Sequence, residues 1–127
     1  MLSGQKVRNK RNLISQAGPK RARRARSASL LEQAGAVLRR ERVTFAAKVR
    51  AARGVLGWSQ RELGLRVSMT QKSIYRMEQG THDLRRSTVV IVEQILKDEG
   101  IEFEDLPDGG FTIVVPEVIL SKLERNI

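Results

Sequence analysis

The sequence predicts a mainly α-helical domain that carries a short C-terminal β-hairpin and a disordered, basic N-terminal tail. Three observations predict this fold. Apolar residues recur at three- and four-residue steps between residues 45 and 96. Serine, threonine and glycine stand where the predicted helices begin and end. Near the C-terminus, a turn rich in glycine separates two short runs of aromatic and β-branched residues.

Length and composition limit the class of protein. A chain of 127 residues suits one domain with one appendage. The absence of Cys excludes disulfides and thiolate metal sites, and His82 is the single His. With no obvious convergent carboxylate pair, we expect no enzyme, no catalytic or metal-binding residue and no cofactor. No apolar run approaches the ~20 residues that span a bilayer, so we expect no membrane partner.

The net charge of +10 is unevenly distributed. Residues 1–30 contain nine basic residues and no acidic one, and residues 43–80 contain seven basic and two acidic residues. Residues 98–127 contain eight acidic and two basic residues. The basic tail and the basic middle suggest a polyanionic partner, whereas the acidic end is expected to face away from it.

Residues 1–28 are expected to be disordered, because they combine few large apolar residues with many positive charges. Two interpretations of this tail stay open. It could lie along phosphates or in a minor groove and add affinity with little sequence preference. It could instead be a solubilising extension, or the product of an upstream start codon. An organellar transit peptide has a similar composition.

Two short helices are predicted in the first half of the chain. Ser29 followed by Glu32 has the spacing of a capping box, so residues 29–42 are expected to form a short helix or linker. Thr44 can cap a second helix over residues 45–56, whose apolar side chains recur on one face. A glycine follows directly and is expected to end this helix.

The second helix opens the main predicted domain, residues 43–100. Residues 59–66 begin with another capping box, Ser-Gln-Arg-Glu, and residues 70–79 begin with a capping threonine and stop at Gly80. Only three residues separate these two helices, which is the spacing of a helix-turn-helix. Residues 87–100 are expected to form the last helix of the domain.

The C-terminal part, residues 101–127, has a different pattern. Residues 101–103 and residues 111–115 are typical of strands, and residues 106–110 form a turn signal between them. We therefore expect a β-hairpin, followed by a short helix that Pro116 opens. This part is expected either to support dimerisation or to cap the helical bundle.

The helix over residues 70–79 has two different faces. With Ile74 pointing inward, Met77 and Glu78 fall on the inner side. The outer side holds only basic and uncharged side chains: Lys72, Tyr75, Arg76 and Gln79, with Gln71 at the N-terminal edge. Arg and Lys pair with guanine O6 and N7, and Gln pairs with adenine N6 and N7, so this face suits a major groove. The alternative is an ordinary solvated helix face.

The segment from about Thr44 to Leu96 resembles the Cro/cI-type helix-turn-helix family, also called the xenobiotic-response-element regulators. Three stretches carry the resemblance: Val-Arg-Ala-Ala-Arg from Val49, Gly-Trp-Ser-Gln-Arg-Glu-Leu from Gly57, and Thr-Gln-Lys-Ser-Ile-Tyr-Arg-Met-Glu-Gln-Gly from Thr70. The last stretch is close to lambdoid phage repressors. The resemblance implies a compact lambda-repressor-like bundle that binds DNA as a dimer and regulates transcription.

The resemblance also implies roles for individual residues. Base edges would be contacted by Gln71, Lys72 and Arg76. The DNA backbone or the groove edge would be contacted by Gln60, Thr70, Ser73 and Tyr75, although Tyr75 could merely cover the surface. Arg53 and Glu78 match a buried ion pair that ties the first helix to the recognition helix. Such a pair explains why a glutamate occupies the inner face.

Two residues depart from the family pattern. Gly64 stands where the family usually has Ala, and it keeps the contact between helices close. Ser68 stands where the family usually has Gly, so Ser68 is expected to adopt the turn conformation, with a positive φ as one possibility.

The predicted function is that of a cytoplasmic, nucleoid-associated regulator, such as a repressor, that binds double-stranded DNA as a homodimer through the helix at residues 70–79. Two alternatives stay open. The first is an antitoxin-like or bridging protein-interaction module with the same fold, whose acidic C-terminal part contacts a toxin-like or other protein partner. The second is RNA binding through the basic tail.

Overall fold

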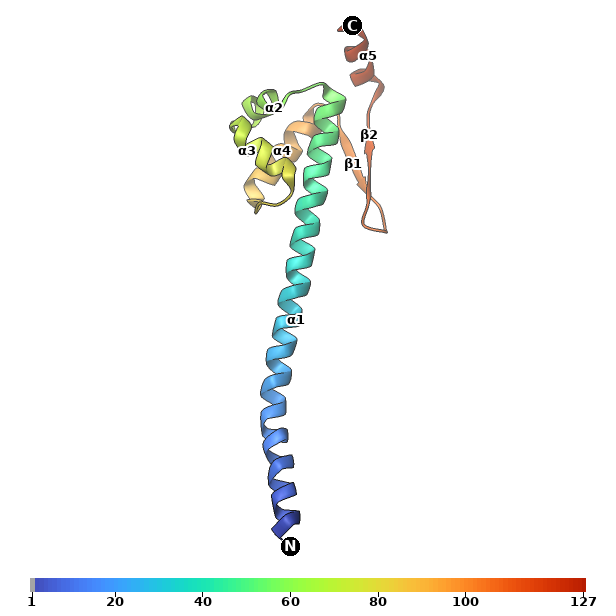
Figure 1. Ribbon diagram of the computed structural model, residues 1–127. Coiled ribbons are helices and arrows are strands. Elements are labelled where there is room, and N and C mark those ends of the chain that lie inside the picture. Colours follow the sequence, from blue (N-terminus) through green and yellow to red (C-terminus); the bar gives the residue numbers. More distant parts are fainter. Residues whose placement is uncertain (1) are drawn as a thin grey trace. The chain divides into compact units, whose positions relative to one another are not determined.

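The structure is a computed structural model that describes the backbone of residues 2–127 and the side chains of residues 19–127. Over this range five helices and two strands follow one another: α1 (Leu2–Leu56), α2 (Gln60–Val67), α3 (Gln71–Gln79), α4 (Arg86–Asp98), β1 (Glu102–Asp105), β2 (Phe111–Val114) and α5 (Glu117–Arg125) (Figure 1). The chain divides into two units, Met1–Leu38 and Arg39–Ile127. The prediction of a mainly helical chain with a short hairpin is confirmed.

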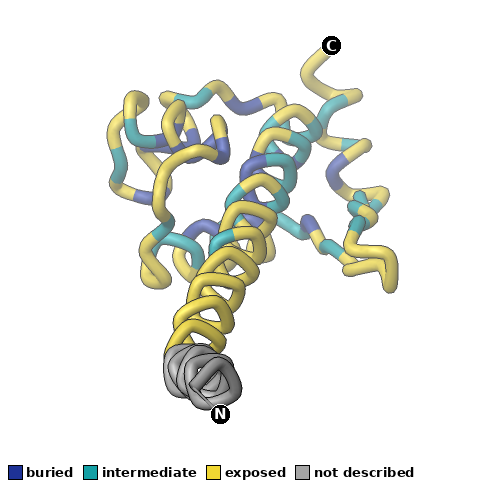
Figure 2. Tube along the Cα trace, turned by 60° about the horizontal axis from the view of Figure 1, so that its bottom comes forward, coloured by how far each residue is buried: buried dark blue, intermediate teal, exposed yellow. Residues whose placement is uncertain are grey.

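The N-terminal unit differs from the sequence prediction. Disorder was predicted over residues 1–28, whereas helix α1 already begins at Leu2, and Ser29 lies within α1 instead of capping a new helix. Residues 19–34 are exposed throughout, as the yellow part of the helix in Figure 2 shows. Their sequence is rich in Ala and Arg, which favour helices even where nothing is buried. The side chains of Lys6, Arg8, Lys10 and Arg11 lie outside the described residues.

The boundary predicted at Thr44 is also wrong, because α1 passes through this residue without a break. No proline occurs between residues 20 and 56, so nothing in this stretch removes a backbone hydrogen bond of the helix. A threonine caps a helix only where the backbone leaves the helical conformation, and it does not do so here. The predicted end at Leu56 is correct.

The second unit is built around an apolar core. The largest fully buried side chains come from α1, α2, α3, α4 and the start of the hairpin: Val49, Leu63, Ile74, Val92, Leu96 and Ile101. Phe45 and Ala52 of the predicted apolar face are buried beside them. Each large aliphatic side chain that is removed from water contributes about 1.5–3 kcal/mol, so this cluster is the main source of stability.

The cap residues at the start of α2 and at the ends of α1 and α3 are those that the sequence predicts, whereas α4 ends at Asp98 and not at residue 100. The hydroxyl of Ser59 accepts a hydrogen bond from the N–H of Glu62, and the carboxylate of Glu62 accepts one from the N–H of Ser59. Gly57 and Gly80 adopt left-handed conformations, with φ of 69° and 70°, and end α1 and α3. Helix α4 begins at Arg86, one residue earlier than predicted, and has no side-chain cap.

The two strands form the predicted antiparallel hairpin, in which Glu102 pairs with Val114 and Asp105 pairs with Phe111. Strand β1 extends beyond the predicted residue 103, since its length is set by its pairing with β2. Phe103 and Ile113 pack against the core. Helix α5 follows directly after the proline that was expected to open it. None of the helices in the described part of the chain has the length and apolar composition needed to cross a membrane.

Candidate nucleic-acid interface

Helices α2 and α3 are joined by a turn of three residues, 68–70. Ser68 has φ of 57° and ψ of 43°, and it is the one residue other than glycine with a positive φ in the described backbone. The N–H groups of Ser68 and Met69 both donate to the carbonyl of Gly64. A Cβ atom on Gly64 would lie 2.5 Å from the carbonyl oxygen of Met69. The turn therefore folds back so closely that it requires glycine at this position, and the expected positive φ of Ser68 is confirmed.

Thr70 begins α3 as predicted. Its hydroxyl accepts a hydrogen bond from the N–H of Ser73 at 3.1 Å and donates one to the hydroxyl of Ser73 at 2.9 Å. The N–H groups of Gln71 and Lys72, in the first turn, have no acceptor within the helix. The positive end of the helix dipole lies at the same place, so this N-terminus can bind an anionic group such as a phosphate.

The two faces of α3 are divided as predicted. Ile74, Met77 and Glu78 are buried, and the outward side chains are exposed: Gln71, Lys72, Tyr75, Arg76 and Gln79. In the structure as described, none of these five side chains makes a hydrogen bond or an ion pair within the chain. Their amide, ammonium and guanidinium groups are therefore free to contact an external partner.

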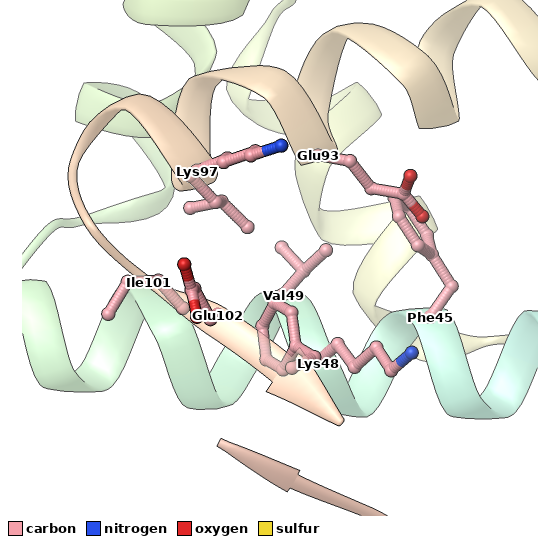
Figure 3. Close-up of a pocket in the computed structure, with 9 residues that line it drawn as sticks. Phe45, Lys48, Val49, Glu93, Lys97, Ile101 and Glu102 are labelled. Carbon is pink, nitrogen blue, oxygen red and sulfur yellow. The ribbon is translucent and has the colours of Figure 1, made fainter. Parts of the chain in front are cut away.

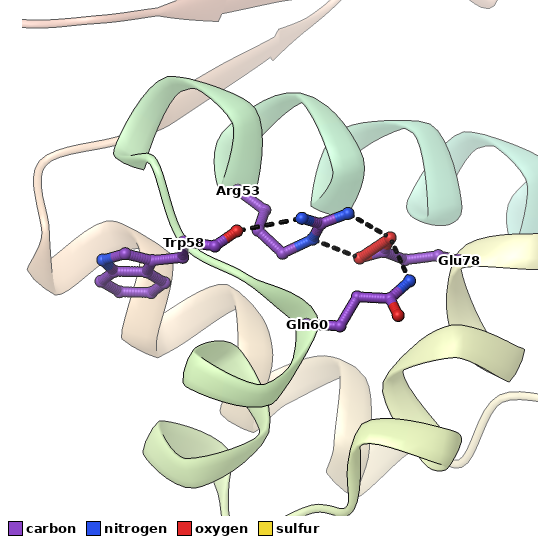
Figure 4. Close-up of polar contacts among 4 residues, drawn as sticks. All are labelled: Arg53, Trp58, Gln60 and Glu78. Atoms are coloured by element: carbon purple, nitrogen blue, oxygen red, sulfur yellow. Dashed lines mark hydrogen bonds and ion pairs between the residues drawn. The ribbon is translucent and has the colours of Figure 1, made fainter.

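The inner face of α3 is fixed by an ion pair between Arg53 and Glu78 (Figure 4). The guanidinium binds the carboxylate with two hydrogen bonds, from Nε to Oε2 at 2.9 Å and from Nη2 to Oε1 at 2.8 Å. Nη1 of Arg53 also donates to the carbonyl oxygen of Trp58 at 2.9 Å. The carboxylate is nearly inaccessible, with Glu78 4% exposed. The expected buried pair is confirmed, and it connects α1, the start of α2 and α3.

The Arg53–Glu78 contact favours the positive charge of Arg53. The hydrogen bonds that Arg53 donates to Glu78 raise the pKa of Arg53 above its ordinary value, and this effect exceeds the opposing effect of burial. A basic group whose pKa is higher in the folded than in the unfolded state stabilises the folded protein fully at pH values below the unfolded-state pKa. This stabilisation is lost only as the pH rises through the folded-state pKa. The guanidinium of Arg53 therefore stays charged over the whole physiological pH range.

Gln60 has a contact that the sequence did not reveal. Its Nε2 atom donates to Oε1 of Glu78 at 3.2 Å, so the side chain completes the hydrogen bonds of the buried carboxylate. The expected phosphate contact of Gln60 would have to use the second N–H of the same amide. Eighteen residues separate the two partners, and no short-range pattern links them.

Trp58 and Arg66 form a second contact that sequence analysis missed. The guanidinium carbon of Arg66 lies 3.9 Å from the centre of the indole ring, a cation–π arrangement. Trp58 is 9% exposed and belongs to the core cluster. Trp58 is therefore covered by protein and does not present a face on which a base can stack.

A pocket with a volume of about 380 Å³ opens in another part of the second unit. Figure 3 shows its lining by α1, α4 and the start of β1: Phe45, Lys48, Val49, Glu93, Leu96, Lys97, Ile101, Glu102 and Phe103. The amine of Lys48 is held by Asp105 at 2.9 Å and lies 5.5 Å from the ring centres of Phe103 and Phe111. No lining residue belongs to α2 or α3. The pocket is thus separate from the outward face of α3.

No protein-family model matches the sequence, and a search of curated proteins finds no match either. The assignment of a function to the α3 face therefore depends on its own geometry and chemistry.

Proposed function

We propose that the protein is a sequence-specific regulator of transcription that places α3 in the major groove of double-stranded DNA. Under this proposal α2, the turn and α3 form a helix-turn-helix within a lambda-repressor-like bundle. One observation supports this proposal more strongly than the others. The Arg53–Glu78 ion pair holds the inner face of α3 against the rest of the domain. The side chains of the outer face are basic or uncharged, and they make no hydrogen bond or ion pair within the described chain.

The chemistry of the outer face defines the roles. Arg76 and Lys72 donate to guanine O6 and N7, and the carboxamide of Gln71 pairs with adenine N6 and N7. The absence of any carboxylate from this face favours the approach to a polyanion. A solvated helix face would tolerate acidic residues among these positions.

Contacts to the DNA backbone fix the position of the helix. The backbone N–H groups of Gln71 and Lys72, which follow the Thr70 cap, bind a phosphate at the N-terminus of α3. Ser73 and Tyr75 contact the DNA backbone at the edge of the groove. The remaining side-chain N–H of Gln60 donates to a phosphate. Two copies of the chain bind adjacent half-sites, so that their recognition helices are about 34 Å apart on successive major grooves.

The proposal is tested by selection of DNA fragments from a genomic library. Three proteins are compared: the full chain, the variant Gln71→Ala/Lys72→Ala/Arg76→Ala, and the control Lys97→Ala/Lys122→Ala. The control removes the same net charge from the exposed surface outside α3. Circular dichroism and urea unfolding verify that all three proteins are folded.

We expect the full chain and the control to enrich the same palindromic motif, and the α3 variant to enrich none. Enrichment of the same motif by the α3 variant would overturn the roles of these side chains. The whole proposal is refuted if the full chain enriches no motif. Co-purification of a stable partner protein in that case would favour the protein-interaction module, and selective binding of RNA would favour RNA binding through the basic tail.

A further inference from the structure

Five of the seven residues at positions 20–26 in α1 are basic: Lys20, Arg21, Arg23, Arg24 and Arg26. Each of them is exposed. Within the described residues none forms an ion pair, and the one side-chain hydrogen bond joins Nε of Arg26 to the carbonyl of Ala22 at 3.4 Å. The first acidic residue of the sequence is Glu32, beyond the three- and four-residue steps that would allow a pair on the helix.

Repulsion among these positive charges destabilises the helix in this segment. Side chains three or four residues apart are neighbours on a helix, and four such pairs here are both positive: Lys20–Arg23, Lys20–Arg24, Arg21–Arg24 and Arg23–Arg26. Like charges at this spacing destabilise a helix. The segment also buries nothing, and an isolated helix without a packed face is only marginally stable in water. Neutralisation of the charges by an external polyanion would remove this repulsion.

The arrangement of the charges fits phosphates on two sides. At 100° per residue, Lys20 and Arg24 lie near the middle of the basic arc, with Arg21 on one flank and with Arg23 and Arg26 on the other. The remaining face carries only Ala22 and Ala25, which are small, and Ser27 lies within the basic arc. A helix in a groove of duplex DNA has a phosphate chain along each side. Phosphate contacts of this kind carry no sequence information.

We infer that the basic segment, residues 20–26, is a second DNA contact that binds phosphates of duplex DNA without sequence preference and gains helical stability from them. The identity of the partner rests on the proposed function. The segment supplies affinity for any duplex, and α3 supplies the choice of sequence. Each contact between a basic side chain and a phosphate releases counterions, so it increases the dependence of binding on salt.

The test compares three full-length proteins. The arm variant is Arg21→Gln/Arg23→Gln/Arg24→Gln, in which glutamine preserves helix propensity. The matched control is Lys97→Gln/Lys122→Gln/Arg125→Gln, which removes the same charge from exposed positions of the second unit. Fluorescence anisotropy gives the affinity of each protein for a duplex that lacks the selected motif, over a series of salt concentrations. Far-UV circular dichroism records the change in helicity on addition of the same duplex.

We expect the slope of log K against log salt to become shallower by up to about 2.7 in the arm variant, since each phosphate contact contributes about 0.9. The control should keep the native slope. The gain of helicity on DNA should be smaller in the arm variant than in the other two proteins. Affinity for a duplex with the motif and for one without it should fall by the same factor.

Equal slopes for the native protein and the arm variant would overturn the inference. An equal loss in the control would also overturn it, because net charge alone would then explain the effect. A larger slope difference on duplex RNA than on DNA would refute DNA as the partner. If α3 does not select a sequence, the native protein and the arm variant should still differ in the slope of log K against log salt on motif-free DNA. The two proposals can therefore be refuted independently.

Discussion

Replacement of Glu78 by alanine is expected to destabilise the second unit strongly. The substitution removes the acceptor of two hydrogen bonds from Arg53, at 2.9 and 2.8 Å, and of one from Gln60, at 3.2 Å. The guanidinium then stays in place with a single partner, the carbonyl of Trp58. A partly buried positive charge and a partly buried amide would both lose their carboxylate acceptor.

The size of the effect follows from the burial of the pair. Removal of one partner of a buried ion pair typically costs 3–5 kcal/mol. The side chain of Arg53 is 23% exposed, so water can hydrate part of the abandoned guanidinium, and we expect the lower end, about 3 kcal/mol. With an m-value of about 1.5 kcal/mol/M, the midpoint of urea unfolding falls by about 2 M.

Urea unfolding followed by tryptophan fluorescence measures this loss, because Trp58 is the single tryptophan and is buried in the core beside the pair. Glu93→Ala serves as the control, since this exposed glutamate of α4 makes no ion pair within the described residues, and its loss should change stability by less than about 0.5 kcal/mol. The double variant Arg53→Met/Glu78→Leu should recover most of the stability, because an apolar pair leaves no unpaired charge. The reasoning is refuted if Glu78→Ala costs less than about 1 kcal/mol, or if the double variant is no more stable than the single one.

Two further predictions concern the turn between α2 and α3. Gly64→Ala should destabilise the protein by about 1–2 kcal/mol, because the clash of the new Cβ with the carbonyl of Met69 exceeds the gain in helix propensity; an unchanged urea midpoint would contradict this. Ser68→Gly should raise the melting temperature, since it removes a left-handed strain of about 1 kcal/mol at φ 57°, and a lower melting temperature would show that this strain is absent.

The features that the sequence predicted correctly depend on contacts between residues close in the chain. Ser59 and Thr70 each cap the helix that follows through an N–H three residues away. Gly80 ends α3 because of its own conformation. The inward position of Glu78 follows from helical periodicity, and its pairing with Arg53 followed from a resemblance to known regulators, not from local pattern.

The features that the sequence did not predict depend on the uninterrupted course of helix α1 or on contacts between segments distant in sequence. Ser29 and Thr44 have the chemistry of caps, but α1 continues through both, and no proline between residues 20 and 56 removes a backbone hydrogen bond of the helix. The contact of Gln60 with Glu78 and the pocket beside α4 arise only when segments distant in sequence come together. Periodicity within one element contains no information on such contacts.

The independence of the outer face of α3 from the fold has a practical consequence. The five outward residues make no hydrogen bond or ion pair within the described chain, and the helix is held by its caps, by Ile74 and Met77 in the core and by Glu78. Substitutions at these five positions that keep a similar helix propensity should therefore leave the backbone and the stability of the protein little changed. Differences in behaviour among such variants would then report the chemistry of the outer surface of α3, separated from effects on folding.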